Sequence, residues 1–213
     1  MRALTVMAML SVLPAVSQAV IVDRVAVVVG NKVITQSEIE ERIRLTAFQN
    51  GETPDLSPAS RKQATQRLID QRLIEREMDV GHFPGATPER GAELLADYEK
   101  SKYPSGHESL LEALAADGLA ESDIEGDLMR QADLLTFLDL RFRPAVQVDD
   151  QEVQKYFDEK VPAGPLKKQE GLSGMRAQIE QLIANQRADK DLDNWLQDQR
   201  KRVPIEYVDK DLQ

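Results

Sequence analysis

The sequence predicts a mainly α-helical protein with a small β element, formed by an N-terminal hairpin and a C-terminal strand. Three observations indicate this fold class. Residues 22–29 and 203–208 are rich in β-branched and aromatic side chains. Between them, helix-capping signals recur ahead of segments whose apolar residues return every three or four positions. Apolar residues make up 41% of the 213 residues and charged residues 30%, so the chain can build a hydrophobic core.

The first segment has the pattern of a secretory signal peptide. A short positive start at Arg2 precedes an apolar run over residues 3–13, and Ser17 and Ala19 supply small residues for a cleavage site. The run is too short for a membrane span, which needs about 20 apolar residues. A buried N-terminal helix is the alternative. We therefore expect residues 1–19 to be removed and the protein to be exported.

The next segment is predicted to be a hairpin that leads into a helix. Residues 22–29 favour a strand, Gly30 and its neighbours favour a turn, and residues 33–34 resume the extended pattern. Thr35 and Glu38 then have the spacing of a capping box, so a helix should begin here and end near Gln49.

Three further helices are expected before residue 118. Ser57 and Pro58 begin one that runs to about Val80, and its apolar residues point in several directions, as in a central helix. Thr87 begins the next, to about Ser101. A short helix over residues 107–117 then ends at Gly118.

The fifth predicted helix has more apolar side chains than one buried face requires. A capping box at Ser122 is expected to begin it, and it should end near Arg141. One stripe should face the core: Ile124, Leu128, Ala132, Leu135 and Leu138. Four apolar residues lie off this stripe and must be covered by this chain, by a second copy or by a bound client. These candidate client-binding residues are Met129, Leu134, Phe137 and Leu140.

The C-terminal part is predicted to contain a short helix, a linker and a long helix. Asp149 caps a helix that ends near Lys160, and the Pro- and Gly-containing residues 161–171 favour an exposed linker. The last helix, residues 172–202, would be about 45 Å long. Its two halves carry apolar stripes on opposite sides, so we expect each half to contact a different group of helices. A break near Gln186 is the alternative.

Composition argues against several classes of function. The 37 acidic residues exceed the 27 basic ones, for a net charge of −10, which disfavours binding to nucleic acid or to anionic lipid. With no cysteine and two histidines, the chain offers no thiolate or His-rich metal site. No Gly-rich phosphate loop is present, so we expect no ATP, cofactor or metal, and we identify no catalytic residue.

Several stretches, in this order, resemble the SurA-type periplasmic chaperones. They are residues 22–38 (VDRVAVVVGNKVITQSE), 68–75 (LIDQRLIE), 148–157 (VDDQEVQKYF) and the tail from Met175 to Val208. The resemblance implies an N-terminal helical lobe over residues 20–160, completed by the helix and strand of residues 172–213. Family members often carry a parvulin isomerase domain between these blocks. Here residues 161–171 stand in its place, too few for a domain of at least about 50 residues.

The resemblance therefore implies a periplasmic, ATP-independent chaperone core without prolyl isomerase activity. Its partners would be unfolded outer-membrane or secreted proteins, held in an apolar cleft. A dedicated assembly factor that binds one folded partner in the cell envelope is the alternative, and a prolyl isomerase is a third. A homodimer is also compatible with the sequence, because the hairpin edges need covering. No membrane span is expected in the mature chain.

Overall fold

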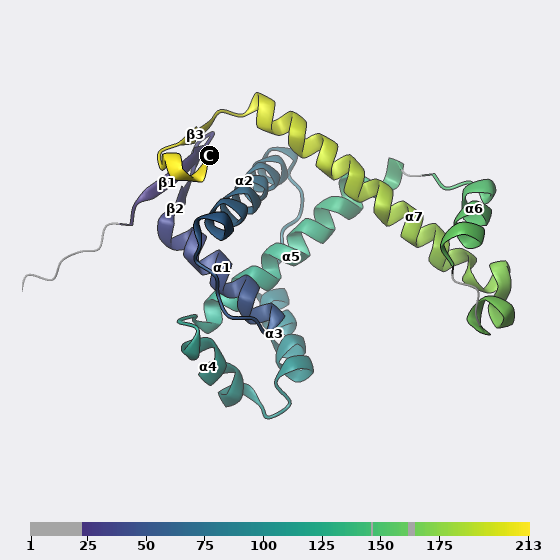
Figure 1. Ribbon diagram of the computed structural model, residues 1–213, viewed down its shortest axis with the longest axis horizontal. Coiled ribbons are helices and arrows are strands. Elements are labelled where there is room, and N and C mark those ends of the chain that lie inside the picture. The colour runs from purple at the N-terminus through teal and green to yellow at the C-terminus, as the bar shows by residue number, and fades with distance from the viewer. Residues whose placement is uncertain (1–22, 146, 162–164) are drawn as a thin grey trace, which may run out of the picture.

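The computed structural model describes residues 23–145, 147–161 and 165–213 (Figure 1). The predicted signal peptide, Val146 and residues 162–164 of the predicted linker lie outside these ranges. Within them the chain is mainly helical, with a small three-stranded antiparallel sheet, as predicted. The elements are β1 (Val25–Val29), β2 (Lys32–Thr35), α1 (Gln36–Asn50), α2 (Pro58–Gly81), α3 (Pro88–Lys102), α4 (His107–Ala116), α5 (Glu121–Arg141), η1 (Arg143–Ala145), α6 (Asp150–Lys160), α7 (Pro165–Arg202), β3 (Ile205–Tyr207) and η2 (Lys210–Leu212).

The sheet joins the beginning of the described chain to its end. Its strand order is β2-β1-β3, with β1 antiparallel to both neighbours and Val28 opposite Glu206. Gly30 has a φ of 60°, which suits the tight β1–β2 turn, and its N–H donates to the carbonyl of Pro204 at 2.8 Å. The sheet packs on α2 through a buried cluster that includes Val27, Ile34 and Leu68. The prediction that the last strand returns to the hairpin is confirmed.

Most predicted helix starts are confirmed by hydrogen bonds at the caps. The side chains of Thr35, Ser57 and Thr87 each accept an N–H from the first turn of their helix. The predicted start at Ser122 is wrong, because α5 already begins at Glu121. The Asp123 carboxylate accepts the N–H of the preceding residue 120 at 2.8 Å, and this bond stabilises the earlier start.

A second hydrophobic cluster joins α1, α3, α4 and the beginning of α5. Phe48 stacks on Tyr103 with an interplanar angle of 8°, so Tyr103 is part of ordinary packing. The buried members of the cluster are Leu45, Phe48, Leu95, Leu110, Leu114, Leu119 and Ile124.

Helix α7 runs along the molecule, from α6 at one end to β3 at the other (Figure 1). Its first half buries Ile179 and Ile183 against Val153 and Phe157 of α6. Its second half packs Leu192, Trp195 and Leu196 against α2 and α5. The prediction that the two halves contact different helices is confirmed, and α7 has no break near Gln186.

The prediction that residues 161–171 form an exposed linker is wrong for its second half. Residues 165–170 are helical and form the first turns of α7, where an exposed linker was expected. The helix is interrupted at Gly171, whose φ of 62° and ψ of −171° are non-helical. A glycine adopts this conformation at little steric cost, so two helical segments can follow each other with no loop between them.

Helix α6 begins with a capping box in which both hydrogen bonds are formed, and this cap should control the local stability of the helix. Asp149 accepts the N–H of Glu152 at 2.9 Å, and the Glu152 carboxylate accepts the N–H of Asp149 at 3.1 Å. The variant Asp149→Ala should raise hydrogen-exchange rates of α6 amides about fivefold, the effect of losing a cap worth about 1 kcal/mol. The exposed neighbour Gln151 is the control, and Gln151→Ala should leave these rates unchanged. Equal effects of the two variants would contradict the role of the cap.

Among the described residues, no helix combines the length and the apolar character that crossing a membrane requires.

Candidate functional site

A cleft of about 330 Å³ lies where α1, α2, α5 and α7 meet. These helices come from distant parts of the sequence, and Figure 1 shows α2 and α5 beneath the C-terminal half of α7. The lining residues are Arg42, Thr46, Arg67, Asp70, Gln71, Ile74, Glu75, Met78, Asp127, Arg130, Gln131, Asp133, Leu134, Leu192 and Leu196. The cleft therefore combines an apolar part with a rim of charged and amide side chains.

The apolar part of the cleft comes from three helices. Ile74 and Met78 belong to α2, which is apolar on several sides because it packs against the sheet on one side and lines the cleft on another. Leu134 comes from α5, and Leu192 and Leu196 come from α7. Apart from Ile74, these side chains are unbranched or γ-branched, and such side chains adjust their rotamers to different ligands more readily than β-branched ones.

An aromatic cluster lies behind the apolar part and joins α2, α5 and α7. Phe137 is fully buried at its centre. Its ring centroid lies 5.3 Å from that of Phe83, 5.6 Å from that of Phe142 and 5.5 Å from that of Trp195. Edge-to-face contacts at these separations are favourable beyond the burial of area. The cluster therefore fixes α7 against α5 and keeps this side of the cleft in place.

The polar part of the cleft is organised around Asp127, which is only 2% exposed. Its carboxylate pairs with Arg42 of α1 and accepts hydrogen bonds from Gln49 at 2.9 Å and Gln131 at 2.8 Å. Arg42 also donates to the side chain of Gln71 on α2 at 3.0 Å. One buried carboxylate thus connects α1, α2 and α5.

The environment of Asp127 lowers its pKa below the ordinary value. Burial alone would raise the pKa, but the Arg42 charge, the Gln131 hydrogen bond and the Arg130 charge together outweigh burial. The carboxylate is therefore ionised throughout the physiological pH range, and the charge on Arg42 is compensated.

A second ion pair holds α7 against α2 at the rim of the cleft. Arg200 donates to Asp70 at 2.8 Å, and also to the side-chain and backbone oxygens of Gln66 at 2.6 and 3.0 Å. Burial raises the pKa of Asp70 despite the Arg200 charge. The amide of Gln66 donates in turn to the hydroxyl of Tyr207 on β3 at 2.9 Å. The rim is thus connected to the sheet.

The structure separates the four predicted client-binding residues. Leu134 lines the cleft. Phe137 is fully buried in the aromatic cluster, so it offers no surface to a client, and its assignment is wrong for this conformation. Leu140 is 51% exposed but does not line the cleft. Met129 packs toward α3, where a Cβ on Gly91 would lie 2.7 Å from its sulfur.

The predicted core stripe of α5 also needs a correction. Ile124 and Leu138 are buried, but Leu135 is 56% exposed. The physical reason is that α5 packs on α3 and α4 through Ile124 and Leu128, whereas its later turns pack toward α2 and α7, which cover Phe137. The buried face therefore rotates along the helix.

Sequence reasoning missed the polar residues of the cleft. Asp127 lies three positions after Ile124, within the apolar stripe of α5, and an acidic residue at such a position indicates a buried charge that needs a partner. The partner, Arg42, lies 85 positions away and cannot be identified from spacing.

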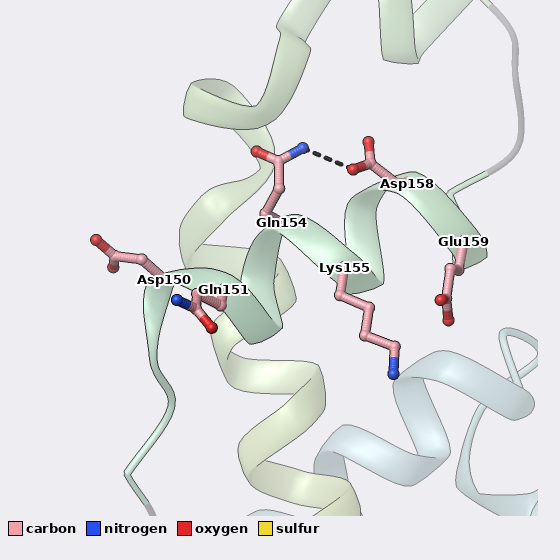
Figure 2. Close-up of a pocket in the computed structure, with 6 residues that line it drawn as sticks. All are labelled: Asp150, Gln151, Gln154, Lys155, Asp158 and Glu159. Atoms are coloured by element: carbon pink, nitrogen blue, oxygen red, sulfur yellow. Dashed lines mark hydrogen bonds between the residues drawn. The ribbon is translucent and has the colours of Figure 1, made fainter.

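A larger hollow of about 500 Å³ lies along the surface of α6, but it is not enclosed by side chains from more than one element, as a binding site would be. Figure 2 shows that its six lining side chains all come from this one helix, with Gln154 donating to Asp158 at 2.9 Å. The lining residues are Asp150, Gln151, Gln154, Lys155, Asp158 and Glu159. A ligand here would rest on one polar helix face without opposing walls.

No protein-family model matches the chain, and no curated protein matches it. Within the described part of the chain, no group of three or more His, Asp or Glu side chains is arranged to hold a metal ion. The cleft is therefore the feature on which a functional proposal rests.

Proposed function

We propose that this protein is an ATP-independent chaperone that holds unfolded client proteins by covering their apolar segments. The observation that carries this proposal is the cleft between α1, α2, α5 and α7, with Ile74, Met78, Leu134, Leu192 and Leu196 in its apolar part and a charged rim. Binding of the unfolded state removes it from the aggregating pool by mass action, without any reaction.

The construction of the cleft supports this role. Four of its five apolar residues are leucine or methionine, and these flexible side chains suit clients of many sequences. The aromatic cluster and the Asp127 network hold the surrounding helices in place, so the cleft exists before a client binds. A volume of about 330 Å³ is enough for a few apolar side chains of one extended segment.

The resemblance to SurA-type chaperones supports a location and a client class. We propose that the protein acts in the periplasm after removal of residues 1–19, on outer-membrane or secreted proteins, and without isomerase activity. A β-barrel protein diluted from denaturant is therefore the appropriate test client. A proline-peptide isomerisation assay that remains at the uncatalysed rate supports the absence of isomerase chemistry.

Holding activity should be visible as slower aggregation. Light scattering of the diluted β-barrel protein should rise more slowly with stoichiometric chaperone present, and Trp195 emission should change because this ring lies behind the cleft. Unchanged scattering and unchanged emission would contradict the proposal. A single stoichiometric folded partner recovered from the cell envelope would instead favour the assembly-factor alternative.

A charge placed in the apolar part of the cleft should remove this activity. The variant Leu134→Asp should bind the unfolded client about tenfold more weakly, since a buried leucine contributes about 1.5–3 kcal/mol. The control is Leu111→Asp, because Leu111 is 38% exposed on α4, away from the cleft. Circular dichroism shows whether both variants are folded. If the two variants slow client aggregation equally, the client binds outside the cleft.

A further inference from the structure

Helix α6 and the first half of α7 pack on each other as a separate part of the molecule, the arm, which comprises residues 148–161 and 172–183. Figure 1 shows the arm at the end of α7 that lies away from the sheet. All described members of its hydrophobic cluster come from these two ranges: Val148, Val153, Tyr156, Phe157, Val161, Leu172, Met175, Ile179 and Ile183. The side chains that hold α6 against α7 are therefore distinct from the cores of the rest of the molecule.

The core of the arm is much smaller than that of the body, which comprises the sheet, α1 to α5 and the second half of α7. Among the described residues, four are buried in the arm cluster, whereas twelve are buried in the cluster around the sheet alone. Hydrophobic stabilisation grows with the apolar area removed from water. Opening the arm should therefore cost less free energy than unfolding the body.

The ion pairs between α6 and α7 add little to this stability. Arg176 pairs with Asp150, and Arg187 pairs with Glu152. All four side chains are more than a third exposed to solvent. Pairs with this exposure contribute little, because water and salt screen them. The stability of the arm thus depends on its small apolar cluster and on the cap of α6.

The second half of α7 is held to the body independently of the arm. Residues 184–191, about two helical turns, separate Ile183 of the arm cluster from Leu192, which packs on the aromatic cluster. All of this stretch is described, none of it belongs to either cluster, and its one buried side chain is the methyl group of Ala188. Opening of the arm can therefore stop within residues 184–191 and leave Leu192 in place.

We propose that the arm unfolds and refolds as one cooperative unit while the body, with the sheet and the cleft, remains folded. Local units of this kind open at free energies below that of global unfolding, and they often coincide with supersecondary motifs. The open state exposes Phe157, Ile179 and Ile183 to solvent, whereas Leu134 and Leu192 keep their places in the cleft. The fold thus contains a conformational step that requires no client and no change in the cleft.

Native-state hydrogen exchange of the whole protein tests this proposal. Amides of α6 and of residues 175–183 should share one opening free energy, because they open together. Relative to unfolded-chain rates, they should exchange at least about tenfold faster than the buried amides of α2. Equal protection of α6 and α2 amides would overturn the proposal.

Two matched substitutions separate the arm from the body. Ile179 of α7 and Ile69 of α2 are 1% and 0% exposed, and each loses one methyl group on replacement by valine, a change mild enough to preserve the fold. Ile179→Val should raise the exchange rates of α6 amides about fivefold and leave those of α2 unchanged. Ile69→Val should leave the α6 rates unchanged and lower the urea midpoint reported by Trp195, which lies in the body. If either substitution accelerated exchange equally in α6 and α2, the arm and the body would be one cooperative unit, and the proposal would be wrong.

Discussion

Replacing Phe137 with alanine is expected to lower the free energy of unfolding by about 4 kcal/mol, in the middle of the range for buried aromatic residues. The residue is fully buried and contacts the rings of Phe83, Phe142 and Trp195. Truncation would leave a cavity between α2, α5 and α7 that these helices cannot fill without moving apart. Urea unfolding followed by emission of Trp195, the single tryptophan, measures the loss.

Leu140 provides a matched control on the same helix. Because it is 51% exposed, Leu140→Ala should change the free energy of unfolding by less than about 1 kcal/mol. Both residues are apolar, and both lie off the core stripe that the sequence predicts. If the two substitutions cost the same, Phe137 would not be the centre of the contact between α5 and α7. Phe137→Ala should also weaken client holding, because α7 supplies Leu192 and Leu196 to the cleft.

Asp127→Asn is expected to destabilise the protein by about 3 kcal/mol near pH 7, since it leaves the charge of Arg42 uncompensated in a largely buried position. The more exposed ion pair between Asp139, near the C-terminal end of α5, and Arg143 of η1 is the comparison. Asp139→Asn should cost no more than about 1 kcal/mol. Equal costs would show that burial of Asp127 has no energetic consequence.

The cost of Asp127→Asn should also depend on pH in a defined direction. The folded-state pKa of Asp127 is lowered, so its contribution is fully present above the unfolded pKa of about 3.9. It is lost as the pH falls through the folded pKa. Wild type and variant should therefore converge below about pH 4. Asp70, whose pKa is raised, contributes to the pH dependence of stability with the opposite sign. Because Asp70 is present in both proteins, its contribution cancels in the difference between them. A difference that stays constant to low pH would contradict the assignment.

Local chemistry was sufficient to predict most of the secondary structure. Thr35, Ser57, Thr87 and Asp149 all cap helices as expected, because a cap depends on residues three positions apart. The start of α5 was misplaced because Ser122 has a good capping composition, whereas the bond actually formed joins Asp123 to the backbone of residue 120. The helical residues 165–170 were missed because prolines and glycines favour a linker on average.

The sequence also showed that α5 has more apolar residues than one buried face requires, but it did not show which of these residues are buried. Leu134 lies in the cleft, Phe137 is buried and Leu135 is exposed, although all three lie within one turn. Which side of a helix is covered depends on where distant helices cross it. Periodicity gives the angle between side chains and contains no information about what lies opposite each of them.

The amino-acid sequence by itself determined the mainly helical fold class and the order of the elements, since these depend on capping, β-branching and apolar period. The return of the last strand to the hairpin was implied by the resemblance to the SurA-type chaperones. Only the tertiary structure decided that Arg42, Gln71 and Asp127 meet, and that α7 closes one side of a cleft. The physical reason is that a buried charge and a cleft are both made by residues far apart in the chain. Their contacts are specified by packing, which no local pattern records.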